Sequence, residues 1–395
     1  MNARQNTFLP MLVIVITISI LGFAVGVNAF FIPFVKDAFN ISTSMSYMVM
    51  TATYSAYVLF GIPSGYILTK LGYKGGIAVA LILIGFGFFF IAPAGKIISF
   101  PLFLIALFIN GMGQTLLTGS VSTYIAIMGP EESAVSRMSI MGIFNKLSFA
   151  GASFILSGFM DLTDVNPEDV IIPFYVISGV LVGGGILFFF SPLPEIKEEI
   201  ESDKTESSQK AVDGGSKTSI FQFPHLFLGF IALFFYMGVE VIALGSINDY
   251  ATVLNLPSPA SYVWLVSGGM IIGYIAGAIF IPKYITQRKA FIIFTLLGII
   301  TTILIYIVPG KINIYLVALL GLANSLLYPA IWPLAIANLG KYTKIGTSIL
   351  VMSITGGAVI PIVFGYLVDI SSYRFAYLIC LPIYLLILFY ALYGY

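Results

Sequence analysis

Two charged side chains lie inside long apolar runs of the sequence, where no neighbour in the chain can neutralise them. Glu240 stands in FFYMGVEVIAL, residues 234–244, and Lys146 follows Asn145 in another run. A charge at the centre of a bilayer costs about 2.5–3.5 kcal/mol on insertion scales, so we treat both as functional candidates. If they meet, they form a buried ion pair that a ligand can break by replacing either partner. The alternatives are a static salt bridge, or two side chains that extend to the membrane surface.

A second candidate set combines hydrogen-bonding groups with aromatic faces. Asn324, Tyr328 and Trp332 recur every four residues, which places them on one face of a helix. Pro329 and Pro333 loosen the same stretch of backbone. A mixed lining of this kind suits a solute that carries both hydroxyl groups and apolar C–H surfaces. Ordinary helix packing with an aromatic ridge is the alternative.

Polar residues in other apolar runs complete the candidate site. They are Gln114, Thr118 and Ser122, which share a spacing of four, together with Asn28, Tyr54 and Asn145. Hydrogen bonding between helices is the alternative explanation for each of the last three. Asp249 lies nine residues beyond Glu240, on the opposite face of a helix and about 13 Å along its axis. This position favours a gating or loop contact.

The composition indicates a membrane protein. Of 395 residues, 59% are hydrophobic and 9% are charged, whereas soluble domains carry about 25% charged residues. The net charge of +1 provides no basic field for nucleic acid. Cys380 and His225 are the only cysteine and histidine, which excludes an internal disulfide and metal clusters built on those residues. The apolar runs hold too few ionisable groups for an enzyme, and we expect neither a cofactor nor a metal.

The apolar runs number twelve, and each suits a helix of about 20 residues that crosses a bilayer. The expected spans are 10–35, 45–69, 75–95, 100–128, 138–160, 172–193, 222–250, 260–281, 290–309, 313–338, 345–368 and 374–394. They predict an all-α membrane protein with two six-helix bundles, residues 1–193 and 220–395. The charged, Ser/Gly-rich segment 194–219 is the expected linker.

Lys and Arg fall unevenly between alternate loops. With a cytoplasmic N-terminus, thirteen of the 18 lie on the inner side, Lys146 lies within a span, and four lie outside: Lys36, Lys96, Lys311 and Arg374. The positive-inside rule therefore predicts that both termini and the linker lie in the cytoplasm. We expect a multi-pass protein of the plasma (inner) membrane.

The two halves carry a weak repeat. Gly65 in PSGYILTKLGYK and Gly277 in AGAIFIPKYITQRK both precede a cationic loop, and they are 212 positions apart. SGFMDL from Ser157 matches GYLVDI from Gly365 at an offset of 208. A nearly constant offset across an even number of spans predicts parallel, pseudo-symmetric halves with a binding site between them at the midplane.

Four segments also carry a family resemblance. The twelve spans and the glycine-rich cationic loop resemble the major facilitator superfamily, although Thr69 stands at its usual acidic position. That loop is also similar to the fucose, galactose and glucose cation symporter family. The other similar segments are MGPEESAVSRMSIMGIFNK (128–146), YMGVEV (236–241) and residues 328–369, which begin YPAIWPLAIANLGKYTK.

The resemblance implies a monomeric secondary transporter that takes up a monosaccharide of the glucose, galactose or fucose type by alternating access. Proton-coupled members of the family carry acids at two positions that Ala29 and Thr118 occupy here. The resemblance therefore favours sodium over the proton as the coupling cation, or facilitated uptake. In this interpretation Glu240 binds sugar hydroxyls or the ion, and Lys146 supplies the positive charge that a proton supplies in relatives. The alternatives are efflux or transport of another small polar solute, and a membrane sensor that does not transport.

Overall fold

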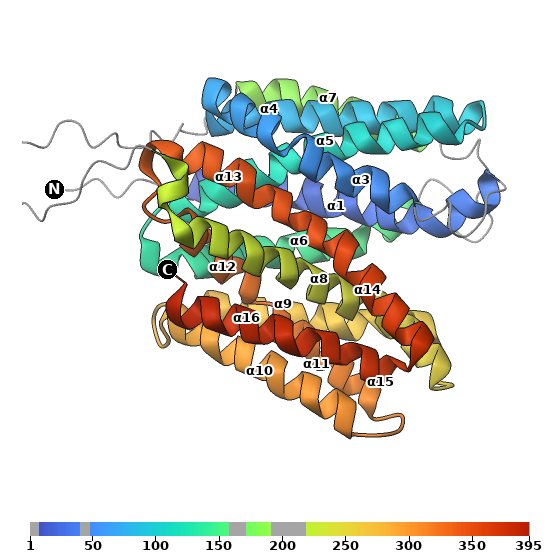
Figure 1. The fold of residues 1–395 in the computed structure, drawn as a ribbon. Helices are drawn as coiled ribbons and strands as arrows, with labels where there is room; N and C mark the ends of the chain where they lie inside the picture. Colours follow the sequence, from blue (N-terminus) through green and yellow to red (C-terminus); the bar gives the residue numbers. More distant parts are fainter. Residues whose placement is uncertain (1–7, 40–47, 158–170, 191–218, 395) are drawn as a thin grey trace, which may run out of the picture.

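The computed structural model describes residues 8–39, 48–157, 171–190 and 219–394, and every regular element in these ranges is helical (Figure 1). Apolar runs form helices because a helix satisfies its backbone hydrogen bonds internally, as lipid requires. The helices of the N-terminal half are α1 (Phe8–Ala38), α3 (Met48–Leu59), α4 (Gly61–Lys96), α5 (Phe100–Ile127), α6 (Ala134–Ser157) and α7 (Ile171–Phe189). Those of the C-terminal half are α8 (Pro224–Val253), α9 (Val263–Phe280), α10 (Gln287–Ile307), α11 (Asn313–Asn324), α12 (Leu327–Ile336), α13 (Thr343–Met352), α14 (Gly356–Ile370), α15 (Tyr373–Ala376) and α16 (Cys380–Tyr393).

Ten stretches of the described chain are long and apolar enough to cross a membrane. The 36 residues of α4 are more than one crossing needs, because a helix of 36 residues at about 1.5 Å each is longer than the roughly 30 Å of hydrocarbon. The backbone leaves helical geometry inside α4 at Gly72, where φ is 70°. Only glycine adopts this conformation without strain. This break separates the second predicted span from the third, and α6 supplies the fifth, so the predicted twelve-span fold is confirmed.

Three of the predicted spans in the C-terminal half are interrupted rather than continuous. The tenth is divided into α11 and α12, because Pro329 lacks the N–H that would bond to the Ser325 carbonyl. The eleventh contains a 3₁₀ turn, Ser353–Thr355, between α13 and α14, and the twelfth contains another, Tyr377–Ile379. The first two breaks lie near the middle of their spans, and the third lies close to the outer end of the twelfth.

The two halves lie side by side, with α1 beginning and α16 ending at the same end of the bundle (Figure 1). We call this the inner end, because Lys70 beside the break in α4, and Lys283 and Lys341 between helices, lie there, and the positive-inside rule assigns such connections to the cytoplasm. The opposite end is the outer end. Residues 191–218, which contain most of the expected linker, lie outside the described residues, so the domain boundaries stay a prediction.

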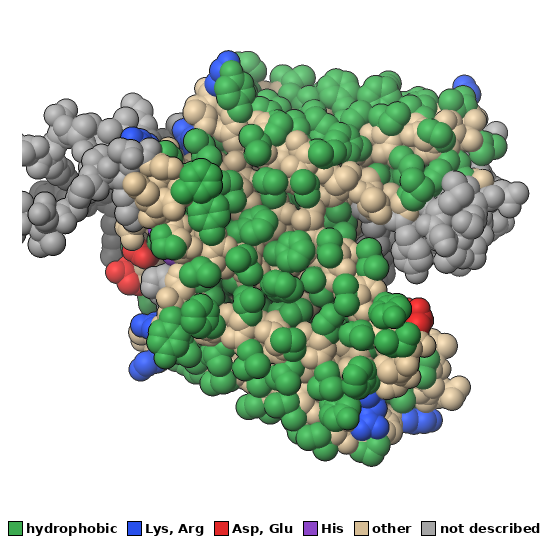
Figure 2. Space-filling model, in the orientation of Figure 1, with side chains coloured by type: hydrophobic (Ala, Val, Ile, Leu, Met, Phe, Trp, Pro, Cys, Tyr) green, Lys and Arg blue, Asp and Glu red, His purple; other side chains and the backbone are tan. Residues whose placement is uncertain are grey.

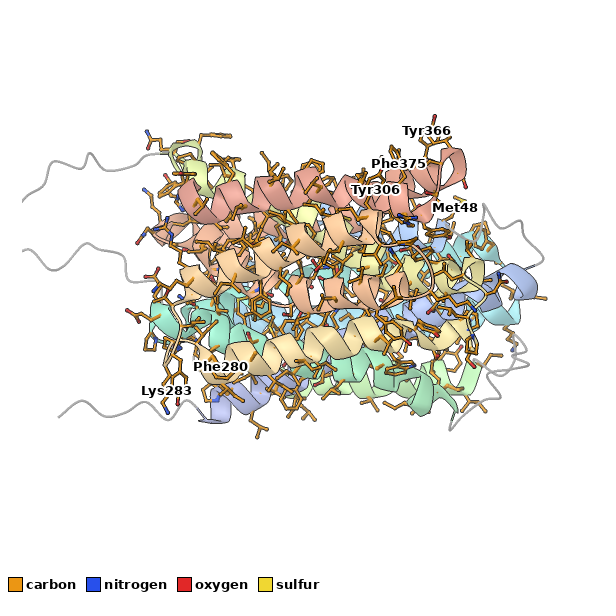
Figure 3. All side chains as sticks on the ribbon, turned by 90° about the horizontal axis from the view of Figure 1, so that it is seen from below. Met48, Phe280, Lys283, Tyr306, Tyr366 and Phe375 are labelled. Atoms are coloured by element: carbon orange, nitrogen blue, oxygen red, sulfur yellow. The ribbon has the colours of Figure 1, made fainter. Side chains whose placement is uncertain are left out.

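The surface matches a membrane environment. On the face shown in Figure 2, hydrophobic side chains fill a broad band, and charged side chains gather toward its two ends. Figure 3 places Tyr306, Tyr366 and Phe375 toward the outer end, and Phe280 with Lys283 toward the inner end. Aromatic and basic side chains at the two borders are typical of membrane–water interfaces.

The repeat seen in the sequence corresponds to two equivalent contacts between the halves. A Cβ at Gly65 would stand 2.6 Å from Ser348 Oγ, and one at Gly277 would stand 2.6 Å from Ser139 Oγ. The glycines are 212 positions apart and the serines are 209 apart, which agrees with the offsets read from the sequence. Each glycine therefore lets a helix of one half approach a serine of the other, on both sides of the pseudo-symmetry axis.

Candidate functional site

An ion pair joins the two halves near the middle of their helices. Lys146 Nζ lies 2.6 Å from Glu240 Oε1, and their side chains are 14% and 11% exposed. Lys146 is central in the 24-residue α6, and Glu240 is central in the 30-residue α8. The two charges that the sequence singled out therefore meet, although their functional role stays a prediction.

Tyrosine side chains surround the carboxylate. The Tyr236 hydroxyl donates to Glu240 Oε2 at 2.5 Å, from one turn earlier on α8. Three further tyrosines from other helices lie within electrostatic range of the same carboxylate: Tyr54 of α3, Tyr274 of α9 and Tyr328 of α12. Both oxygens of Glu240 are thus bonded, and its surroundings combine hydroxyl groups with aromatic faces.

The predicted pair Tyr328 and Trp332 forms an aromatic surface beside this cluster. Their ring centroids are 5.4 Å apart, and Tyr328 also lies 6.3 Å from the ring of Tyr236. The Tyr328 hydroxyl is 2.9 Å from Ser122 Oγ of α5, in the opposite half. Trp332 Nε1 donates to Thr123 Oγ1 at 3.2 Å, so both aromatic residues bridge the halves.

The polar stripe on α5 is present, but its residues have different partners. Gln114 Nε2 donates to Asn110 Oδ1 at 2.6 Å, and Gln114 Oε1 lies 3.5 Å from the hydroxyl of Tyr57. Thr118 also hydrogen-bonds to Tyr57. Tyr57 in turn lies 6.0 Å from the ring of Tyr54, which connects the stripe to the tyrosines around Glu240.

The expectation that Asn324 shares a continuous helix face with Tyr328 and Trp332 is wrong. Asn324 is the last residue of α11, and the helix is interrupted before α12 begins at Leu327. The fully buried Asn324 accepts a hydrogen bond from the Tyr384 hydroxyl at 2.7 Å, inside the C-terminal half. Its proposed contact with a ligand stays a prediction.

The remaining candidates lie around this cluster or outside the described side chains. Asn145 Nδ2 donates to the Ile18 carbonyl of α1 at 3.5 Å. Asp249 is exposed near the outer end of α8. Asn28 belongs to α1, but its side chain lies outside the described part of the structure.

Sequence reasoning missed Tyr57, Tyr236, Tyr274 and Thr123. A signal existed for Tyr236, because side chains four residues apart on a helix are neighbours and Glu240 is four residues later. The other three depend on contacts between helices that are distant in sequence. With 23 tyrosines in the chain, residue type alone could not identify them.

Hydrogen bonds between the halves gather at the inner end. Gln287 Oε1 accepts from Val135 N at 2.7 Å, and Gln287 Nε2 donates to the Glu131 carbonyl at 2.8 Å. Ser136 donates to the Ala278 carbonyl at 3.0 Å. Figure 1 shows α14 diverging from α1 and α3 toward the outer end. Among the described residues, the halves are therefore joined on the inner side of the ion pair and diverge beyond it.

Comparisons with known proteins agree with the helical membrane fold. The model of the Major Facilitator Superfamily matches residues 14–353. The glucose/galactose transporter of Brucella abortus biovar 1 (strain 9-941) is 30% identical over 385 residues, which cover 94% of this chain and 91% of that protein. The L-fucose-proton symporter of Escherichia coli (strain K12) is 26% identical over 373 residues, covering 88% and 84%.

A solved structure has the same fold. The crystal structure of FucP, a Major Facilitator Superfamily transporter in the outward conformation, gives a TM-score of 0.83 at 22% identity. The match covers 98% of this chain and 99% of FucP. At this identity the likeness establishes the fold alone.

Proposed function

The chain belongs to the Major Facilitator Superfamily and, within it, to the fucose, galactose and glucose cation symporter family, and on this premise we propose that it takes up a monosaccharide by alternating access. The family consists of transporters rather than enzymes. The observation that carries the proposal is the Lys146–Glu240 pair, which joins the halves near the middle of their helices within an aromatic surround. A solute that replaces either partner changes the contact on which the relative position of the halves depends.

A sugar suits the groups gathered at this site. Its hydroxyl groups can donate to the Glu240 carboxylate and accept from the Lys146 ammonium. The rings of Tyr328 and Trp332 offer flat faces for its C–H surface, as mixed-lining pockets do. The names of the relatives, glucose/galactose transporter and L-fucose-proton symporter, support the same substrate class.

The coupling cation and the location of the protein in the membrane complete the proposal. Sodium is favoured over the proton as the coupling cation, because Ala29 and Thr118 occupy the positions of the acids found in proton-coupled members, and facilitated uptake is the alternative. The protein acts as a monomer in the plasma (inner) membrane. Both termini are cytoplasmic, an orientation that the distribution of Lys and Arg between loops supports.

Counterflow in proteoliposomes tests the function directly. Vesicles that contain the purified protein and unlabelled D-glucose, D-galactose or L-fucose are diluted into trace labelled sugar without any ion gradient. We expect transient, stereoselective accumulation of label, absent from protein-free vesicles and from vesicles loaded with mannitol or sucrose. Repeating uptake with imposed sodium and pH gradients identifies the coupling ion. A protein that binds these sugars but never exchanges them would be a sensor, contrary to the proposal.

Tyr236→Phe is expected to weaken sugar transport without abolishing it. The change removes the hydroxyl that donates to Glu240 Oε2 and keeps the ring. A hydrogen bond to a charged group contributes about 1.5–3 kcal/mol, so we expect KM to rise roughly tenfold or more. The exposed Tyr284 at the inner end supplies the matched control, and Tyr284→Phe should leave KM unchanged. Equal KM values for both variants would show that the Tyr236 hydroxyl does not belong to the sugar site.

A further inference from the structure

Both oxygens of the Glu240 carboxylate have a donor. Lys146 occupies Oε1 from the opposite half and Tyr236 occupies Oε2 from the same helix. The other titratable groups that face this carboxylate are tyrosines on three further helices: Tyr54, Tyr274 and Tyr328. Among the described residues, Lys146 and Glu240 are the only charged side chains near the middle of the spans. The net charge of this cluster is therefore zero.

A carboxylate in such surroundings needs a neutralising partner. An isolated ionised group taken out of water pays a large desolvation cost, and the usual remedies are a bound proton or a counter-ion. A proton has to be taken up from one side of the membrane, whereas a lysine is covalently attached. The ammonium group of Lys146 is attached to the other half of the protein, so it neutralises Glu240 without any ion from solution.

We infer that Lys146 takes the place of a proton on Glu240, so that transport requires no protonation of this carboxyl. The ion pair at the midplane then has no net charge when the unloaded carrier returns. The inference rests on the proposed transport function and specifies its energetics. A membrane potential of 100 mV changes the free energy of each elementary charge that crosses the membrane by about 2.3 kcal/mol. An ion pair that moves as a unit carries no net charge, so the return of the empty carrier is independent of voltage.

The pH profile of sugar exchange in Lys146→Met tests the inference. We expect the wild-type exchange rate to be flat between about pH 5.5 and 8, because the pair needs no proton in this range. In Lys146→Met, Glu240 has no counter-ion and must take a proton from water before the site can close. The exchange rate of this variant should then fall about tenfold per pH unit above its midpoint, as expected for one proton.

Two matched variants separate the charge from the packing. Lys146→Arg keeps the positive charge and should keep a flat profile. Lys146→Met combined with Glu240→Gln removes both charges, a change that buried pairs often tolerate. Exchange by this variant should be slower than in the wild type, because both side chains belong to the proposed sugar site, but the rate that remains should not depend on pH. Gel filtration of each purified variant establishes that it is folded. A flat profile for Lys146→Met alone, or a folded Lys146→Met protein that exchanges sugar at no pH, overturns the inference.

Infrared difference spectroscopy supplies a readout that needs no transport. The Glu240→Gln change removes the carboxylic-acid band of Glu240 and so identifies it. This band should be absent from the wild type at neutral pH and present in Lys146→Met at acid pH. Detection of that band in the wild type, or alkalinisation of the medium when sugar enters wild-type vesicles, contradicts the inference. Failure of the wild type to exchange any sugar would count against the proposed function, while the infrared result would still decide the protonation state of Glu240.

Discussion

Replacement of Glu240 by glutamine is expected to abolish sugar uptake while the protein continues to reach the membrane. Glutamine preserves the shape of the side chain but leaves the Lys146 ammonium buried without its counter-charge. Truncating one partner of a buried, hydrogen-bonded charge pair costs about 2–5 kcal/mol. Since each 1.4 kcal/mol is a factor of about ten, we expect the initial rate to fall roughly 30-fold or more. The measurement is uptake of labelled sugar, normalised to the amount of purified protein in the vesicles.

The matched control for Glu240→Gln is Asp369→Asn. Asp369 is an exposed acid near the outer end of α14, so the same chemical change there removes a solvated charge. Uptake by Asp369→Asn should stay within about twofold of the wild type, because substitutions of exposed residues usually change free energies by no more than ~0.5 kcal/mol. Normal uptake by folded Glu240→Gln would show that the ion pair is a static contact and would exclude it from the transport site.

The second large effect is expected from Gly65→Val and Gly277→Val. A Cβ at either position would stand 2.6 Å from a serine Oγ of the opposite half, and a serine so close to its backbone has little room to move. Overpacking of this kind costs about 1–3 kcal/mol. At Gly65 the neighbouring atoms all belong to the opposite half, so the strain exists only while the halves are joined at the inner end. A Cβ at Gly277 would also stand 2.5 Å from Leu326 Cδ2 of its own half, so only the part of the strain that involves Ser139 is relieved there on opening. Each variant should therefore favour the inward-open state by about 5- to 150-fold.

Spin labels at the outer end measure this shift. Exposed Lys96 and Asn255 lie at the outer ends of the N- and C-terminal halves, and the distance between labels placed there should shorten when the outer end closes. Gly183→Val supplies the control, because a Cβ at Gly183 meets nothing within 4 Å. A distance distribution in Gly65→Val that matches the control would mean that the Gly–Ser contacts do not hold the inner end closed.

Much of the fold was predictable because lipid imposes strong constraints on sequence. Apolar runs of the required length and the distribution of Lys and Arg were enough to predict twelve spans. The repeat offset predicted that Gly65 and Gly277 have equivalent positions, and both contact a serine across the halves. Lys146 and Glu240 could be singled out because charges inside spans are rare, and they do pair.

The remaining features depend on contacts that sequence does not encode locally. Asn324 has the right spacing for a helix face shared with Tyr328, but the missing N–H of Pro329 ends that helix, and Tyr384 from α16 binds the amide. Tyr57 and Tyr274 resemble the other tyrosines of the chain until the helices pack. Thr123 joins Trp332 to Thr347 through its hydroxyl, and only the docking of α5 against both α12 and α13 brings the three together.

The bridge from Trp332 to Thr123 gives the molecule an intrinsic optical reporter. Trp332 is completely buried and donates across the halves, whereas Trp264, the only other indole in the chain, is 48% exposed. When the inner end opens, water reaches the indole of Trp332, while the surroundings of Trp264 change little. The emission of Trp332 should then shift to the red, so that unlabelled protein reports the opening in real time, with Trp264→Phe removing the background.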